Sequence, residues 1–204
     1  MAIVVVGGHS RNIGKTSVAA GLISALPAGN WTAFKITQFG HGRCSQNGKL
    51  CDCAPQDRCW AMTEEQDRSG KSDSSRFLIA GAKRAFWVRT EQGRLHEALP
   101  AIQRKIAEAE NVILESNSIL QFLQPDLYLT VLDPATEDFK ASAQKYLERA
   151  DGVVLHGKGD PARWREVNAE MFGETPVFQI IPPNYVNEDL IAFTADRLGV
   201  GVAR

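Results

Sequence analysis

Apolar and polar positions along the chain form two kinds of segment. Short, nearly continuous apolar runs bounded by turn-forming residues predict β-strands, and longer runs with apolar residues every three or four positions predict α-helices. The predicted strands cover residues 2–6, 31–37, 84–88, 111–115, 126–132, 152–155 and 176–181. The predicted helices cover residues 15–26, 73–82, 91–109, 137–150, 161–172 and 187–198.

This alternation predicts an α/β fold, with a mostly parallel sheet of about seven strands and helices on both faces. Runs such as Val112-Ile113-Leu114 are apolar throughout, which is typical of strands covered on both faces. The length suits one domain, residues 1–204. Residues 38–70 show no regular pattern and predict an inserted, cysteine-containing loop. Pro100 predicts a kink or break in its helix.

The strongest motif joins the first predicted strand to the first predicted helix. Residues 8–17 read Gly-His-Ser-Arg-Asn-Ile-Gly-Lys-Thr-Ser, one residue longer than the usual phosphate-binding loop (P-loop). In such loops, backbone N–H groups and the positive end of the helix bind phosphate oxygens. Lys15 is expected to reach the β- and γ-phosphates, and the Thr16 hydroxyl to bind Mg²⁺. The other expected nucleotide contacts in the loop are Gly8, Asn12, Ile13, Gly14 and Ser17.

Two further charged residues stand at the carboxyl ends of predicted strands. Glu115 ends the strand 111–115, a position that suits a Mg²⁺-binding acid, and Ser116-Asn117-Ser118 follow it with further hydrogen-bonding groups. Lys35 lies at the end of the second strand and is expected to hold the γ-phosphate or a substrate anion. Ligands of open α/β sheets collect at this edge. The alternatives are an acid without a ligand and a solvated lysine.

Residues after the strand 152–155 suggest which base the nucleotide carries. A Lys-x-Asp triplet, Lys158 to Asp160, resembles the guanine-recognition motif of GTPases. Gly157 stands where that motif has asparagine, unless His156 takes this place in a shifted register. This interpretation favours GTP over ATP. Asp160 before Pro161 is equally an ordinary start of a helix, so both interpretations remain open.

The cysteines are concentrated in one segment. All four lie within sixteen positions, and such clustering suggests a metal site. Four thiolates could hold zinc or an iron–sulfur cluster, with His41 as a further candidate, although the spacing Cys-x6-Cys-x-Cys-x5-Cys fits no familiar zinc-ribbon or ferredoxin pattern. The alternatives are reduced thiols, as expected in the cytoplasm, and an adventitious disulfide. The cluster consists of Cys44, Cys51, Cys53 and Cys59.

Composition excludes several classes of partner. The formal net charge is −1, so no broad basic field predicts nucleic-acid binding. No run of about 18 apolar residues predicts a membrane span. The first residues enter a strand without the segments of a secretion signal. A cytoplasmic protein is therefore expected.

The segment Asp73-Ser-Ser-Arg-Phe-Leu-Ile-Ala-Gly-Ala82 resembles the Asp-Ser-x-Arg-x-x-x-Ala-Gly-Ala signature of the MobB family. That family comprises accessory P-loop GTPases of molybdopterin-guanine dinucleotide biosynthesis. Residues 67–71 resemble the family's Asp-x-Pro-Gly-Lys, whereas the longer P-loop is similar to that of dethiobiotin synthetase. The resemblance implies a homodimer and a protein partner in cofactor assembly. Asp73 is expected to cap a helix, and Arg76 to reach an anion.

Three hypotheses follow. The leading one is a Mg²⁺-dependent nucleoside triphosphate-binding protein that hydrolyses the nucleotide slowly, favours GTP, and assists cofactor biosynthesis or metallocentre assembly. The second is an ATP-dependent small-molecule kinase or ligase of the dethiobiotin synthetase type. The third is a metal-binding scaffold with a vestigial nucleotide site.

Overall fold

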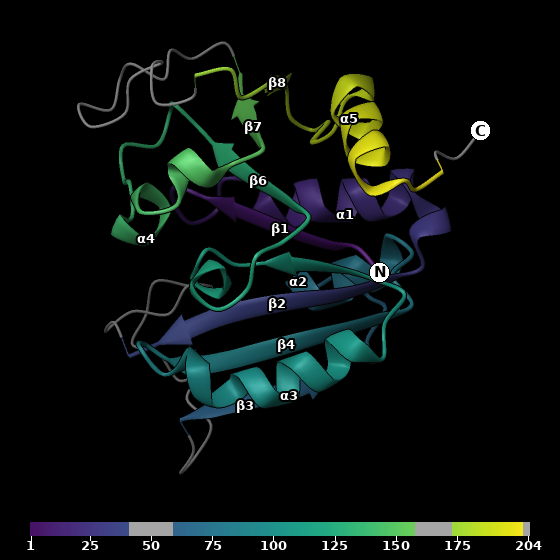
Figure 1. Cartoon of the computed structure of the whole chain (residues 1–204), viewed down its shortest axis with the longest axis vertical. Helices are drawn as coiled ribbons and strands as arrows, with labels where there is room; N and C mark the ends of the chain where they lie inside the picture. Colours follow the sequence, from purple (N-terminus) through teal and green to yellow (C-terminus); the bar gives the residue numbers. More distant parts are fainter. Residues whose placement is uncertain (41–58, 158–172, 202–204) are drawn as a thin grey trace.

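The computed structural model describes residues 1–40, 59–157 and 173–201. In this part of the chain, a sheet of eight strands has the order β3-β4-β2-β5-β1-β6-β7-β8 (Figure 1). The strands are β1 (Ile3–Gly8), β2 (Trp31–Phe39), β3 (Trp60–Glu64), β4 (Arg84–Glu91), β5 (Asn111–Glu115), β6 (Leu127–Leu132), β7 (Gly152–His156) and β8 (Val177–Ile180). The α-helices are α1 (Lys15–Ala25), α2 (Asp73–Ile79), α3 (Leu95–Ala107), α4 (Ala141–Gln144) and α5 (Glu188–Leu198).

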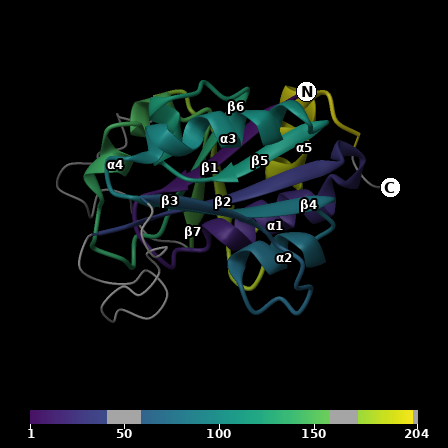
Figure 2. The same cartoon turned by 90° about the horizontal axis from the view of Figure 1, so that it is seen from below.

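The predicted α/β fold is confirmed, because helices pack on both faces of this mostly parallel sheet. Figure 2 shows α3 on one side of the sheet and α1 and α2 on the other. Successive residues of β1 alternate between the two cores: Val4 and Val6 pack with α1, α2 and α5, whereas Val5 packs with α3. Both faces of the central strands are therefore buried, which explains their unbroken apolar sequence.

Parallel pairing places the carboxyl ends of the central strands at one edge of the sheet. Strand β5 lies between β1 and β2, with Glu115 in register with Val6 and with Lys35. Strand β6 pairs with the other side of β1, and β7 with β6. The carboxyl ends of β1, β2 and β5 therefore lie side by side at the edge where open α/β sheets bind ligands.

Three sequence-based expectations need correction. Residues 60–64, predicted as irregular, form the edge strand β3, which pairs antiparallel with β4. The segment 137–150, predicted as one helix, contains only the short α4 and a 3₁₀ helix η3 (Leu147–Arg149). Pro100 lies within α3, which is a single continuous helix. Strand β3 forms through its pairing with β4 and not from a local periodicity of the sequence. The predicted helix 161–172 lies outside the described residues.

Short 3₁₀ turns complete the connections near the sheet edges. They are η1 (Pro27–Gly29) before β2 and η2 (Ser118–Gln121) after β5. Ile119 and Leu120 of η2 are buried against the α3 face, which anchors the chain just after Glu115. Among the described helices, none is long and apolar enough to cross a membrane.

Substitution of a buried isoleucine tests the two-sided core. Ile113, on β5, is 1% exposed and packs on the α1 side. Ile113→Ala is expected to lower the free energy of unfolding by about 2–5 kcal/mol, because it removes buried apolar contacts and leaves a cavity. The matched control Ile79→Ala, at a position 57% exposed on α2, should change it by less than about 1 kcal/mol. Equal losses in urea-induced unfolding would contradict this description of the core.

Candidate functional site

The loop between β1 and α1 has the backbone geometry that a phosphate cradle requires. Gly14, directly before α1, has φ of 85°, and Asn12 has φ of 56°. A Cβ on Gly14 would lie 2.6 Å from a ring carbon of Tyr185 and 2.8 Å from a ring carbon of His156. No side chain among the described residues caps α1. The backbone N–H groups of its first turn are therefore available to an anion.

Asn117 clamps the start of this loop. Its Oδ1 accepts a hydrogen bond from the N–H of Gly8, and its Nδ2 donates one to the carbonyl of Gly8, both at 2.9 Å. A Cβ on the preceding Gly7 would lie 2.2 Å from the same Oδ1, so the close approach needs glycine there. The side-chain amide of Asn117 thus fixes the backbone at the start of the loop through both its oxygen and its nitrogen.

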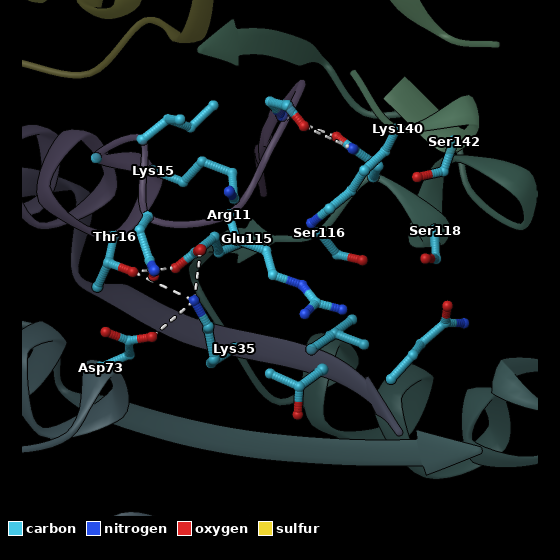
Figure 3. Close-up of a pocket in the computed structure, with 18 of the residues that line it drawn as sticks. Arg11, Lys15, Thr16, Lys35, Asp73, Glu115, Ser116, Ser118, Lys140 and Ser142 are labelled. Carbon is cyan, nitrogen blue, oxygen red and sulfur yellow. Dashed lines mark hydrogen bonds and ion pairs between the residues drawn. The ribbon is translucent and has the colours of Figure 1, made fainter. Parts of the chain in front are cut away.

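Lys35, Glu115, Thr16 and Asp73 converge beside the loop (Figure 3). The Nζ of Lys35 lies 2.5 Å from Oε1 of Glu115 and 2.8 Å from Oδ2 of Asp73. The Thr16 hydroxyl donates to Oε2 of Glu115 at 2.7 Å, and Lys35 donates to Thr16 at 3.2 Å. Glu115 is only 3% exposed. This network joins β2, β5, α1 and α2 through one buried carboxylate.

The two lysines of the site have opposite pKa shifts. Burial lowers the pKa of Lys15 to about 8, although Glu115 acts against this effect. Lys15 donates a hydrogen bond to the carbonyl of Ser10. Burial alone would lower the pKa of Lys35 too, but the carboxylates of Glu115 and Asp73 outweigh it and raise that pKa. Lys35 therefore stays charged in its ion pairs, whereas Lys15 lacks a carboxylate partner among the described residues.

The donor set suits the magnesium ion expected from the sequence. The Thr16 hydroxyl and the Glu115 carboxylate are in direct contact, and the Asp73 carboxylate reaches the same ammonium as Glu115. Hydroxyl and carboxylate oxygens are the ligands that Mg²⁺ prefers. These residues fit the ion, and its binding by Thr16 and Glu115 stays a prediction.

Helix α2 brings its signature residues to the P-loop. Ser72, not Asp73 as expected, is the N-cap: its side chain accepts a hydrogen bond from the N–H of Ser75 at 3.0 Å. Asp73 is the first residue of the helix and reaches Lys35. Arg76 donates to the Ser17 hydroxyl at 2.7 Å. The resemblance in this segment thus corresponds to two contacts of α2, one with Lys35 on β2 and one with Ser17 in the first turn of α1.

The expected base-recognition residues are only partly described. Lys158 and Asp160 lie outside the described residues. His156 ends β7, where its Nε2 is buried with no hydrogen-bond partner among the described residues. Its ring centroid lies 5.6 Å from that of Tyr185, and both rings adjoin Gly14. Tyr185 was missed in the sequence because only the fold brings the segment after β8 back to the loop.

Of the four clustered cysteines, Cys59 lies within the described residues. Cys44, Cys51 and Cys53, with His41, lie outside the described residues. The thiol of Cys59 donates to Oε2 of Glu97 at 2.6 Å, and this hydrogen bond raises the pKa of the thiol. Within the described ranges, no three His, Cys, Asp or Glu side chains form a group that could hold a metal. A zinc or iron–sulfur site therefore stays a prediction.

A cavity of about 870 Å³ contains the network and extends beyond it. It reaches from Tyr185 past the P-loop to Trp87 on β4 and to Lys140 and Ser142 near α4. The expected site residues that line it are Gly8, Asn12, Ile13, Gly14, Lys15, Thr16, Ser17, Lys35 and Glu115. Arg11 and Lys140 also line it and were not expected, because an isolated cation in a polar segment gives no local signal.

No protein-family model and none of the curated proteins matches this chain. Solved structures similar to it include HypB from Helicobacter pylori in complex with nickel (14% identity, 95% of this chain and 86% of that chain, TM-score 0.49). Another is LpxK from Aquifex aeolicus in complex with ATP (18% identity, 88% of this chain and 53% of that chain, TM-score 0.48). A third is a zinc-bound triple mutant of the YjiA GTPase (12% identity, 93% of this chain and 60% of that chain, TM-score 0.45). The chain spans less than two thirds of the LpxK and YjiA chains.

Removal of the Asn117 clamp tests its role. Asn117→Ala is expected to weaken nucleotide binding roughly tenfold, because the Gly8 peptide loses both its fixed partners. The matched control is Asn111→Ala, which removes similar backbone hydrogen bonds to Ala2 and Gly29 at the opposite end of β5. Calorimetric titration should show that the control binds the nucleotide as tightly as the unaltered protein. Urea-induced unfolding should show that the control has a lower free energy of unfolding. Equal effects on binding would contradict the clamp.

The low pKa of Lys15 predicts a pH dependence of nucleotide binding. As the pH rises through about 8, Lys15 of the free protein loses its proton and its attraction for phosphate. Affinity for a triphosphate is therefore expected to fall roughly tenfold between about pH 7 and about pH 9.5. The pKa of Lys140 is also about 8, so the titration is repeated with Lys140→Gln. Loss of the pH dependence in that variant would assign it to Lys140 instead.

Proposed function

We propose that this protein binds a nucleoside triphosphate with Mg²⁺ and cleaves the bond to its γ-phosphate. The observation that carries the proposal is the convergence of Thr16, Lys35 and Glu115 beside an uncapped helix that follows a glycine loop. Phosphoryl transfer needs little covalent chemistry from a protein; it needs positioning and positive charge. This site offers both.

Each side chain would have a distinct role. The N–H groups of the loop and of the first turn of α1 would bind phosphate oxygens, and Lys15 would exchange the Ser10 carbonyl for the β- and γ-phosphates. Lys35, held by Glu115 and Asp73, would place a permanent positive charge near the γ-phosphate. When bound by Thr16 and Glu115, Mg²⁺ would neutralise charge on the phosphate oxygens.

The leading hypothesis adds slow hydrolysis with a preference for GTP. The preference rests on the sequence pattern of Lys158 and Asp160, and the role in cofactor biosynthesis or metallocentre assembly rests on the MobB-like segment. Low turnover is expected for the protein alone, with stimulation by a protein partner. A homodimer is part of the same proposal.

A second candidate is transfer of the γ-phosphoryl group to a small molecule, as in a kinase or ligase. The extent of the cavity favours it, because the part lined by Trp87, Lys140 and Ser142 lies beyond the P-loop. A vestigial nucleotide site is disfavoured, because Lys35 and Thr16 are both in place and contact the two carboxylate oxygens of the buried Glu115.

Replacement of Glu115 tests the proposed chemistry. Glu115→Gln is expected to abolish the gain in nucleotide affinity that Mg²⁺ gives and to lower hydrolysis roughly a hundredfold, because the ion loses its carboxylate. Calorimetry with GTP and with ATP, each with and without Mg²⁺, measures the first effect, and phosphate release measures the second. The matched control Glu110→Gln changes an exposed carboxylate just before β5 and should leave both unchanged. If the unaltered protein binds neither nucleotide, the proposed function is wrong.

A further inference from the structure

Two cations in the cavity are left without a charged partner. Arg11, in the P-loop, and Lys140, just before α4, both line the cavity, and neither forms an ion pair or side-chain hydrogen bond with any described residue. Figure 3 shows the Lys140 side chain extending into the cavity toward Ser116. Burial, followed by the charge of Arg11, lowers the pKa of Lys140 to about 8, although the carboxylates of Asp138 and Glu115 act against this effect. Two neighbouring, partly desolvated cations are unfavourable unless an anion binds between them.

The position of Lys140 is fixed by the P-loop itself. The N–H of Lys140 donates to the carbonyl of His9 at 2.9 Å. The N–H of Asp133 donates to Nε2 of His9 at 3.0 Å, and the Ser10 hydroxyl donates to Asp138 at 2.7 Å. Asp138 also lines the cavity, but one of its carboxylate oxygens accepts this hydrogen bond from Ser10. These contacts tie the segment after β6 to the loop, so the two cations keep their relative placement.

Hydroxyl groups surround the same part of the cavity. Ser116, Ser118 and Ser142 line it, and Figure 3 shows Ser118 and Ser142 across the cavity from Thr16 and Asp73. The nucleotide phosphates already have Lys15, Lys35 and the backbone N–H groups on the Thr16 side. Tyr185, where the cavity adjoins Gly14, lies at another part of the P-loop. The cations and the hydroxyls therefore face space that the phosphate loop does not need.

We propose that Arg11 and Lys140, with the hydroxyls of Ser116, Ser118 and Ser142, form a subsite for the carboxylate or phosphate group of a second, small-molecule ligand. Arginine and lysine bind such groups through charge-assisted hydrogen bonds, and serine hydroxyls add donors. The location of this ligand next to the γ-phosphate rests on the proposed nucleotide binding. The anion subsite itself depends only on the side chains that line it.

The test is an anion titration with the phosphate loop filled. The protein is saturated with Mg²⁺ and the β,γ-imido analogue of the nucleotide that it prefers, and then titrated calorimetrically with inorganic phosphate and, separately, with succinate. The stronger of the two probes identifies the group. Arg11→Ala and Lys140→Ala should each weaken its binding roughly tenfold or more, and at least tenfold more than they weaken nucleotide binding. Arg11→Lys and Lys140→Arg, which keep the charge, should recover part of the loss.

Matched controls separate the subsite from general surface charge. Arg104→Ala and Lys145→Ala remove exposed cations outside the cavity and should leave anion binding unchanged. The proposal is overturned if the nucleotide-bound protein binds neither probe, if Arg11→Ala and Lys140→Ala do not weaken binding, or if they weaken nucleotide binding as strongly. In the last case both cations serve the nucleotide.

Failure of the proposed function has a different signature. If the unaltered protein binds no nucleotide, the same titrations are made on the nucleotide-free protein. Weaker binding of phosphate or succinate by Arg11→Ala and Lys140→Ala would then support the subsite alone, and unchanged binding would overturn it as well.

Discussion

The buried carboxylate of Glu115 is the group on which the arrangement of the site depends. A carboxylate 3% exposed is costly unless it is paired and hydrogen-bonded, and here Lys35 and Thr16 satisfy both oxygens. Those partners come from β2 and α1, and Lys35 adds Asp73 from α2. The placement of three elements is thus coupled to one charge, and the apolar packing of Phe77 and Leu78 with α1 adds to the position of α2.

A second set of contacts fixes the loop from its other side. Asn117 occupies both hydrogen-bonding groups of Gly8, and His9 receives the N–H of Asp133 while its Nδ1 lies 2.7 Å from the carbonyl of Asp138. Burial lowers the pKa of His9, which favours the neutral ring that can accept this bond. The loop is therefore held between the segments after β5 and β6, and its conformation is largely preorganised for a ligand.

The cavity combines two kinds of electrostatic environment. On the Thr16 side, positive charge is balanced by Glu115 and Asp73, so Lys35 is held rigidly and stays protonated. On the side of Arg11 and Lys140 no described carboxylate forms an ion pair with either cation, and burial lowers the pKa of Lys140 to about 8 although Asp138 and Glu115 act against this effect. A balanced region suits a metal–phosphate group, whereas an unbalanced one attracts an anion. This asymmetry is the physical basis for the proposed subsite of a second ligand.

The sequence by itself determined the α/β class, the P-loop and the position of Glu115 at the end of its strand, because apolar runs and the Gly-Lys-Thr motif are local signals. Lys35, expected at the end of its strand, lies within β2, which continues to Phe39. Only the tertiary structure decided that 60–64 is a strand, since its pairing partner β4 lies more than twenty residues away. It also turned Asp73 from an expected cap into the partner of Lys35 and brought Tyr185 and Lys140 to the loop. Contacts between distant segments depend on packing and charge pairing, which no local pattern contains.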